Sequence, residues 1–336
     1  MNSFGTLFRT HIFGASHGAA VGIIIDGCPA GLPLSEADFT EDIERRKGGV
    51  QKGTTPRKED DIPNFVSGVF NGFTTGEPIT IQFANNNIRS ADYEKQRDVP
   101  RPGHADFVAS QKFGGFEDYR GGGHFSGRLT VCLVAAGVIA KKILAHHANK
   151  IVVRATIEEI GGESDLDKGL QKAIDAKDSI GGIVSCTVTN LPIGLGEPFY
   201  ESVESMIGQA VLSIPAIKGI SFGAGFDAAR MFGSEHNDAL EDMSGKTASN
   251  HAGGVVGGLT NGNPLYLKVV VKPTSSTPRE QFTLNTATNE KTAFSVKGRH
   301  DLCIALRVPV VLEAVVATVL ADLMMRAGHI PRIIAG

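Results

Sequence analysis

Two long segments of this chain are apolar on nearly every helical face, and they constrain the fold more than any other feature. The first, at 126–147, opens with a serine as N-cap and stays apolar until Lys141. The second, at 308–328, stops at Gly328. The longest apolar run, at 129–140, is shorter than the roughly 18 to 20 residues of a membrane span. Both segments are therefore predicted to be helices buried between other layers.

Seven shorter segments, rich in β-branched residues and bordered by Gly, Pro or Asn, are predicted to be strands. They lie near 19–26, 67–73, 78–84, 151–159, 182–190, 218–224 and 265–272. A third helix is predicted at 35–46, with Ser35 as N-cap and basic residues at its end. Many short strands with two buried helices predict an α+β fold in which the helices lie between sheets. No Pro/Ser-rich linker divides the chain, so residues 1–336 are predicted to form one domain, with a two-lobed arrangement as the alternative.

A weak internal similarity relates two parts of the sequence. CPAGLPLSEADFTEDI at 28–43 resembles LPIGLGEPFYESVESMI at 191–207. Each follows a predicted strand and leads into an amphipathic helix. A duplication would produce two pseudo-symmetric halves with a shared cleft, whereas chance similarity at this length is the alternative.

Charge and cysteine usage exclude several classes of protein. The net charge of −3 gives no global attraction to nucleic acid or to an anionic membrane. The four cysteines form neither a C-x-x-C pair nor a metal-ligand cluster, so we expect no metal site and reduced core thiols in a cytoplasmic protein. The first residues lack the basic segment and apolar core of a signal peptide.

Glycine-rich polar loops next to the predicted helices are candidate sites. The segment at 44–60 carries six cations, and its glycines would let several converge on one small polyanion; a solvated helix end is the alternative. The segments at 101–107 and 111–130 form a polar loop before the first buried helix, where free N–H groups suit a phosphate. Taken alone, His104 is best explained as a turn histidine paired with Asp106.

Two later segments offer further polar groups. SNHAGGVVGGLTNGNPLYLKVVVKPTSS at 249–276 has the glycine density of a phosphate-binding loop, but neither G-x-G-x-x-G nor P-loop spacing. Its end provides one cation and several hydroxyls, with a plain Ser/Thr turn as the alternative. KGRHDLC at 297–303 directly precedes the second buried helix. Its Arg299, His300 and Asp301 are consecutive, so at most two of them can face one cleft.

The segment GASHG at 14–18 fits the G-x-S-x-G pattern of a nucleophile elbow. That motif requires a helix after the serine, whereas the residues at 19–27 read as a buried strand. The elbow interpretation of Ser16 therefore fails. What remains is His17, on a loop of small residues that a ligand can approach closely.

The ordered set of motifs resembles that of the chorismate synthase family. It comprises FGASHG, DGCPAGLPL, RPGHADF, KFGGFEDYRGGGHFSGR, SNHAGGVVGGLTNGNP, KPTSS and GRHD, from Phe13 to about Asp322. The resemblance implies a lyase that converts 5-enolpyruvylshikimate 3-phosphate to chorismate and phosphate by an anti 1,4-elimination. This is the final step of the shikimate pathway toward aromatic amino acids. The reaction requires reduced FMN (FMNH2) without net redox change.

The resemblance also implies a fold, an assembly and a source of electrons. The expected fold is a β-α-β sandwich of antiparallel sheets around central helices, with an internal pseudo-two-fold axis. The expected assembly is a cytoplasmic homotetramer. Electrons would come from a separate flavin reductase or from NADP-linked reduction, and the sequence leaves that choice open.

By the same resemblance, the motif residues acquire roles. His17 matches the acid that protonates the departing phosphate, His104 the histidine associated with protonating the reduced flavin, and Asp301 the acid that takes the flavin N5 proton. The substrate-binding positions are Ser16, Arg46, Lys52 and Arg128. The FMN-binding positions are His124, Phe125, Ser126, Ala216, Gly258, Lys272, Pro273, Thr274, Ser275, Ser276 and Arg299.

The chain departs from the family pattern at a few of these positions. Where many members have GGGRSSARET, this chain has GGGHFSGRLT, so His124 replaces an arginine, Phe125 a serine and Leu129 a glutamate. Lys52 stands where arginine is common and keeps the charge without the bidentate fork.

Two other functions use part of the same residues. A serine hydrolase would combine Ser16, His104 and Asp301 as a triad. A non-catalytic binder of phosphorylated metabolites or flavin would use the basic loops alone. Neither explains the full ordered set of motifs.

Overall fold

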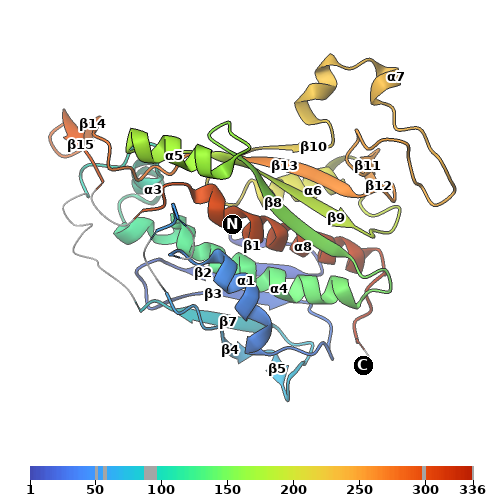
Figure 1. The fold of residues 1–336 in the computed structure, drawn as a ribbon. Coiled ribbons are helices and arrows are strands. Elements are labelled where there is room, and N and C mark those ends of the chain that lie inside the picture. Colours follow the sequence, from blue (N-terminus) through green and yellow to red (C-terminus); the bar gives the residue numbers. More distant parts are fainter. Residues whose placement is uncertain (50–51, 56–58, 87–96, 297–299, 335–336) are drawn as a thin grey trace.

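Two long helices lie side by side between two antiparallel sheets (Figure 1). The computed structural model describes residues 1–336 except 50–51, 56–58, 87–96, 297–299 and 335–336. The helices are α4 (Thr130–His146) and α8 (Val308–Arg326), which correspond to the two predicted apolar segments. The predicted α+β sandwich is therefore confirmed.

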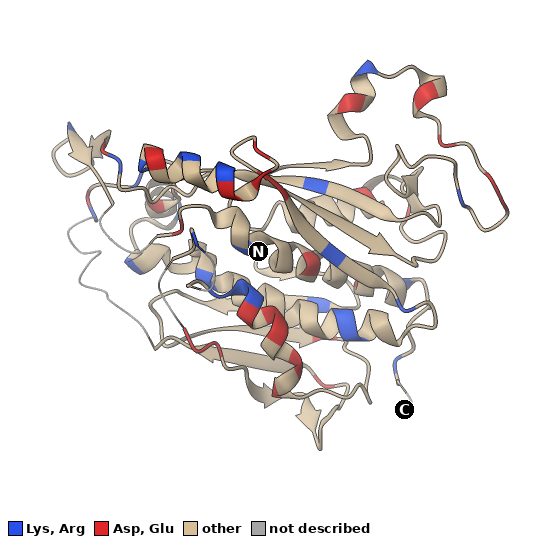
Figure 2. Cartoon of the chain, viewed as in Figure 1, with Lys and Arg blue, Asp and Glu red and all other residues tan. Residues whose placement is uncertain are grey.

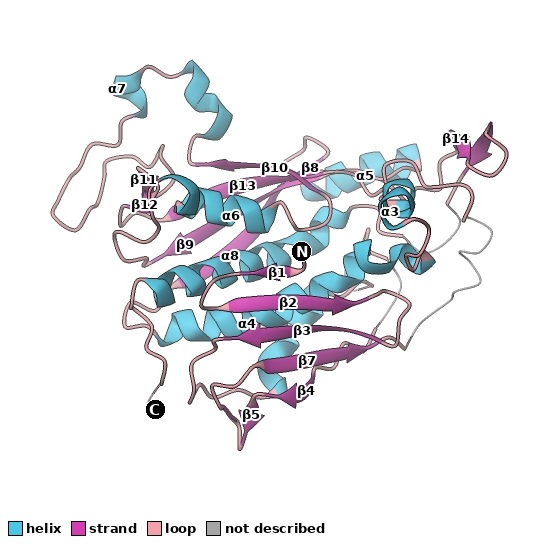
Figure 3. Cartoon of the chain, turned by 180° about the vertical axis from the view of Figure 1, so that it is seen from behind, coloured by secondary structure: helices cyan, strands magenta, loops and turns pink. Residues whose placement is uncertain are grey.

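The two sheets have the following strands. The first has the order β1 (Ser3–Phe4), β2 (Arg9–Gly14), β3 (Ala20–Asp26), β7 (Ile79–Ala84) and β4 (Asn64–Ser67), seen in Figure 3. The second has the order β10 (Ile217–Phe222), β13 (Leu265–Val271), β9 (Gly182–Thr189) and β8 (Val152–Ile160). Every pair within them is antiparallel. Six of the seven predicted strands are confirmed to within two residues at either end.

The remaining elements connect or cover these layers. The helices are α1 (Thr40–Arg46), α3 (Asp106–Phe113), α5 (Leu166–Ala176), α6 (Val203–Val211) and α7 (Gly233–His236). The hairpins are β5 (Val69–Phe70) with β6 (Phe73–Thr74), β11 (Val255–Val256) with β12 (Leu259–Thr260), and β14 (Gln281–Asn285) with β15 (Glu290–Phe294). Short 3-10 turns occur at Glu36–Phe39, Arg120–Phe125, Gly127–Leu129, Phe199–Glu201, Gly225–Arg230 and Ile304–Arg307.

The central helices approach each other through small residues. A methyl group on Gly137 of α4 would lie 2.2 Å from Cβ of Ala314 on α8. By length and composition alone both helices could cross a membrane, but 67% and 78% of their most apolar windows are buried within this protein. Figure 2 shows that charged residues crowd α5 and are sparse along α8. Burial between two sheets accounts for the missing polar face of each helix.

The two sheets repeat one topology. In each, the strands that come first, second, fourth and third along the chain are neighbours in that order: β2-β3-β7-β4 and β8-β9-β13-β10. Helix α1 or α6 follows the second strand, and α4 or α8 follows the fourth. The similar segments at 28–43 and 191–207 occupy equivalent places. The predicted internal pseudo-symmetry is thus visible in the connectivity.

One buried threonine in each half makes the same hydrogen bonds. Thr74 accepts the N–H of Leu32 at 3.0 Å and donates its hydroxyl to the carbonyl of Pro29 at 2.6 Å. Thr260 accepts the N–H of Leu195 at 2.9 Å and donates to the equivalent proline carbonyl at 2.6 Å. The repeat therefore extends to individual side chains.

The predicted strand at 67–73 is wrong. The chain there ends β4 and forms the tight β5–β6 hairpin, whose turn residues Asn71 and Gly72 have φ of 50° and 78°. Two consecutive positive φ values are the signature of an Asn-Gly hairpin turn, a local signal that outweighs the apolar content of the segment. All four cysteines are buried with free thiols, as predicted.

Candidate active site

A loop of three glycines lies between the two predicted catalytic histidines. Gly121, Gly122 and Gly123 all have positive φ, at 59°, 80° and 52°. A methyl group on Gly121 would lie 2.1 Å from Cε1 of His17, and one on Gly122 would lie 3.0 Å from Cε1 of His104. Both imidazoles therefore pack on the backbone of one loop, which only glycine can form without strain or collision.

Ser16 and His17 are buried in the tight turn between β2 and β3. The Ser16 N–H donates to the carbonyl of Gly123 at 3.0 Å, which ties this turn to the glycine loop. The Ser16 hydroxyl has no hydrogen-bond partner within the described part of the chain, and β3 follows where an elbow would need a helix. The hydrolase triad is not assembled in these residues, because His104 and Asp301 bind other partners.

His104 is held by an ionised carboxylate. Its Nδ1 lies 2.5 Å from Oδ1 of Asp106, and Arg101 donates to the same carboxylate at 2.7 and 2.8 Å. Burial alone would raise the pKa of Asp106, but hydrogen bonds from Arg101 and His104 outweigh it and hold the pKa far below its usual range. The pairing expected from the sequence is confirmed, and it fixes the ring that faces Gly122.

Asp61 is a buried carboxylate that joins two of the predicted substrate-binding residues. Its side chain is 0% exposed. Arg46 donates to it at 2.7 Å and Arg128 donates to its other oxygen. Burial would raise the pKa of Asp61, and the two guanidinium groups lower it below its usual range. Asp61 therefore remains charged at the centre of the pair.

The same cluster extends to Asp301 through Arg307. Arg307 donates to the carbonyl of Arg46 at 2.7 Å and to Asp301 at 3.0 Å. The N–H of Thr55 donates to the other oxygen of Asp301 at 2.8 Å. Sequence analysis did not identify Arg307, because a single arginine inside an apolar segment gives no motif.

This cluster has more positive than negative charge. Within the described residues, Arg46, Arg128 and Arg307 form ion pairs with two carboxylates, Asp61 and Asp301. Burial, followed by the charge of Arg307, lowers the pKa of Arg46 to about 10. An anionic ligand would compensate this buried excess of positive charge.

The KPTSS segment meets the loop that carries His104. Lys272 donates to Ser275 at 2.9 Å and to the carbonyl of Gly103 at 3.2 Å. Arg101 donates to Ser276 at 3.4 Å. Burial and then the neighbouring Lys218 lower the pKa of Lys272. A cation and two hydroxyls thus lie beside His104, a set suited to a phosphate.

Other predicted residues border this region. The carbonyl of Ala216 accepts the N–H of Lys272 at 2.9 Å. Pro273 follows Lys272 directly, while the carbonyl of Thr274 accepts a bond from Ser179 at 2.8 Å. Phe125 lines a small recess of about 20 Å³ together with His104 and Gly122.

His300 is a site residue that the motif roles omitted. Burial and then the charge of Arg101 lower its pKa, which favours the neutral imidazole. Its Nε2 is buried and has no hydrogen-bond partner among the residues that the structure describes. The consecutive Arg299 lies outside the described residues. The side chain of His300 therefore offers an unsatisfied polar atom within the electrostatic influence of Arg101.

Some predicted residues lie apart from this group. Gly258 accepts the N–H of Val203 at the start of α6, whereas Ala216 and Lys272 lie beyond its end, roughly 13 Å of helix away. His124 bonds the carbonyl of Gly14 at 2.8 Å and Asn2 at 3.1 Å, on the side of β1 and β2.

Two more predicted residues have positions that a motif alone could not define. Lys52 is exposed on the loop after α1. The Ser126 hydroxyl caps the following turn by accepting the N–H of Arg128 at 3.3 Å. Among the described residues, neither side chain binds Asp61 or the guanidinium groups around it.

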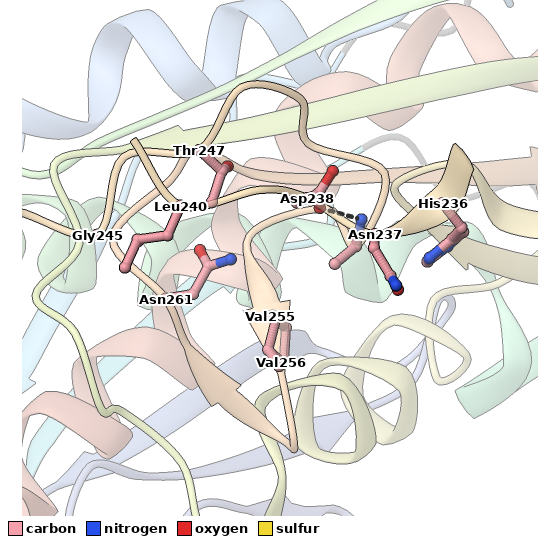
Figure 4. A pocket seen from close by; sticks show the side chains of 10 residues that line it. His236, Asn237, Asp238, Leu240, Gly245, Thr247, Val255, Val256 and Asn261 are labelled. Carbon is pink, nitrogen blue, oxygen red and sulfur yellow. Dashed lines mark hydrogen bonds between the residues drawn. The ribbon is translucent and has the colours of Figure 1, made fainter. Parts of the chain in front are cut away.

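A separate cavity of about 520 Å³ is lined by residues between His236, at the end of α7, and Asn261 (Figure 4). Asp238 accepts backbone N–H groups of His251 and Ala252 there, at 2.8 and 2.9 Å. Leu240 and Val255 form part of its apolar lining. None of the predicted site residues lines this cavity, so its size alone does not make it the active site.

Comparison with known proteins gives a consistent result. A family model described as chorismate synthase matches residues 8–325. A chorismate synthase from Chitinophaga pinensis is 70% identical over 325 residues, covering 97% of both chains. One from Dehalococcoides mccartyi is 43% identical over 362 residues, covering 99% of both. A crystal structure of chorismate synthase has a TM-score of 0.71 at 27% identity, covering 96% of this chain and 93% of that chain.

Proposed function

Because this chain belongs to the chorismate synthase family, we propose that it converts 5-enolpyruvylshikimate 3-phosphate to chorismate and phosphate by an anti 1,4-elimination. The observation that carries the proposal is one glycine loop packed against both His17 and His104, beside a buried cluster with excess positive charge. A reaction that expels phosphate from a multiply charged substrate needs both a positioned proton donor and charge compensation.

The substrate's anionic groups would bind at the arginine cluster. Arg46 and Arg128 share Asp61, so each guanidinium is oriented before a ligand arrives. The Arg46 Nε is buried and has no hydrogen-bond partner among the described residues. Lys52, on the adjacent exposed loop, would add a fourth cation, and Ser16 would position the substrate beside His17.

His17 would protonate the departing phosphate. A histidine changes charge near neutral pH, which suits a general acid under physiological conditions. Its burial in the turn at 15–18 keeps competing water away from the transferred proton. Asp301, oriented by Thr55 and Arg307, would hold the proton removed from the substrate.

The region around Lys272 fits a phosphorylated flavin. Lys272, Ser275 and Ser276 would hold the phosphate, and the unsatisfied Nε2 of His300 and the Arg101–His104 pair would contact polar atoms of the ring. Reduced FMN, when bound, would donate electron density to the substrate and recover it, so no net oxidation occurs. The remaining proposed FMN-binding positions are His124, Phe125, Ser126, Ala216, Gly258, Pro273, Thr274 and Arg299.

We also propose one domain and a cytoplasmic homotetramer. Packing of α4 on α8 joins the two sheets and supports a single domain. Two observations support completion of the site by a neighbouring subunit. Gly258 is far from Lys272 within one chain. In addition, Phe226 and Phe232 are exposed on the segment between β10 and β11. Electrons would come from a separate flavin reductase or from NADPH.

The proposed function is tested by anaerobic incubation of the protein with chemically reduced FMN and 5-enolpyruvylshikimate 3-phosphate. We expect chorismate and phosphate in equal amounts, no product without reduced flavin, and a loss of at least about 100-fold in His17→Ala. The control is His146→Ala, which changes an exposed histidine at the end of α4. FMN binding without turnover would refute the lyase and favour a non-catalytic flavin-binding protein.

A further inference from the structure

We propose that Asn85 is a positioning residue that couples the anion-binding Arg128 to the turn carrying His17. The inference rests on the proposed function for the roles of Arg128 and His17. Asn85 directly follows β7, which places its side chain beside the turn between β2 and β3. It is largely buried, with 9% of the residue exposed.

The side-chain amide of Asn85 uses both of its ends. Its Nδ2 donates to the carbonyls of Ala15 at 3.0 Å and Gly18 at 2.8 Å. Its Oδ1 accepts from Nε of Arg128 at 3.1 Å. Carbonyls only accept and a guanidinium only donates, so these partners fix the orientation of the amide.

The two carbonyls are the two ends of the tight turn. The Gly18 N–H donates to the Ala15 carbonyl at 3.0 Å, which closes the turn with Ser16 and His17 at its centre. The amide of Asn85 holds both ends at once. A shift of Arg128 toward a bound anion would therefore pull on the amide and reorient the turn that presents His17.

Asp61 provides the contrast that isolates this role. It binds Arg128 from the other side, through the guanidinium NH1, and its other oxygen binds Arg46. Within the described part of the chain, its side chain binds Arg46 and Arg128 and no residue of the His17 turn. Changes at Asp61 should alter anion binding, whereas changes at Asn85 should alter the link between anion binding and the His17 turn.

The test compares Asn85→Asp with Asp61→Asn. Asn85→Asp has nearly the same shape and keeps an acceptor for Arg128, but it loses both donations to the turn. Because the new carboxylate also adds a negative charge at Arg128, we expect its substrate Kd, measured by calorimetry, to rise, while kcat at saturating substrate falls at least about tenfold and by a larger factor than Kd rises. Asp61→Asn removes a carboxylate from the arginine cluster but no bond to the His17 turn, so it should change substrate Kd by a larger factor than kcat. Equal losses of affinity and kcat in Asn85→Asp would overturn the proposal.

A second measurement does not depend on turnover. Inorganic phosphate added to the wild-type protein should slow amide hydrogen exchange at residues 14–19, and in Asn85→Asp phosphate should bind without this protection. Loss of protection together with wild-type activity would also overturn the coupling. If Asn85→Asp does not fold, Asn85→Ser serves, and the same loss of protection is expected. A wild-type protein that shows phosphate-linked protection but no turnover would refute the proposed function and leave the coupling standing.

Discussion

Gly121 faces the imidazole of His17 so closely that a methyl group on its Cα would lie 2.1 Å from Cε1. The contact makes the glycine loop part of the wall that fixes the histidine. It also explains why three consecutive glycines precede the first central helix: each has a positive φ, and two of them face a predicted catalytic ring.

Gly121→Ala should therefore reduce turnover at least about tenfold and destabilise the fold by roughly 1–3 kcal/mol, because the new methyl group displaces His17 and strains the backbone. Gly127→Ala is the matched control, since its Cβ would meet nothing within 4 Å and its φ is not positive. Initial rates and urea denaturation measure the two effects. Wild-type rates in Gly121→Ala would contradict the assignment of this loop to the site.

The crossing of α4 and α8 gives a prediction on stability alone. Gly137→Ala should lower the free energy of unfolding by about 1–3 kcal/mol, because its Cβ would lie 2.2 Å from that of Ala314. Gly208→Ala in α6, where a Cβ meets nothing within 4 Å, should instead raise it by about 0.5–1 kcal/mol through helix propensity. Urea denaturation of both variants gives the comparison, and equal effects would contradict the close crossing.

Glu313 should make stability depend on pH. It is 0% exposed on α8 and accepts from Arg45 at 2.8 Å and from Lys141 at 2.7 Å. Burial would raise its pKa, but Arg45 and Lys141 outweigh burial and lower it. A lowered folded-state pKa adds stability above the unfolded pKa near 4.3, and this is lost as pH falls through the folded value.

Glu313→Gln should accordingly cost about 1–3 kcal/mol at pH 7, because Arg45 and Lys141 lose a charged partner but keep Asp42. The difference from wild type should shrink as pH falls below the unfolded pKa and through the lowered folded pKa, where the wild-type carboxylate becomes protonated. Denaturant midpoints measured from pH 3 to pH 8 follow this change. The control is Glu41→Gln on the exposed face of α1. A difference that is constant with pH would show that the charge of Glu313 is not responsible.

The elements that sequence could predict were those whose signal is local. The apolar segments that form α4 and α8 and the β-branched strands can be predicted from their own residues, without knowing what they pack against. The predicted strand at 67–73 was wrong because the prediction gave more weight to the apolar residues than to the Asn-Gly turn signal, which is also local. The short β1 and the hairpin β14–β15 have few core-facing residues, so their pairing depends on tertiary contacts.

Only part of the candidate site could be predicted from the sequence, for the same reason. Family motifs supplied His17, His104 and Asp301, and the His104–Asp106 pair could be read from spacing. Asp61, Asn85 and Arg307 lie in no motif, because their importance comes from which buried groups the fold brings to them. Long-range pairing of this kind has no signature in a single sequence.

The matching hydrogen bonds of Thr74 and Thr260 show that the two halves share one structural template. The loops that the two halves carry on this template differ. Between its first two strands the N-terminal half has only the short turn at 15–19, which carries His17, whereas the C-terminal half has a longer connection that contains α5. A duplicated scaffold would ordinarily offer two equivalent reaction centres. In the proposed mechanism the N-terminal half would present the acid His17, and the C-terminal half would contribute Lys272 and the hydroxyls that follow β13. Two topologically equivalent halves therefore contribute different residues to one proposed centre per chain.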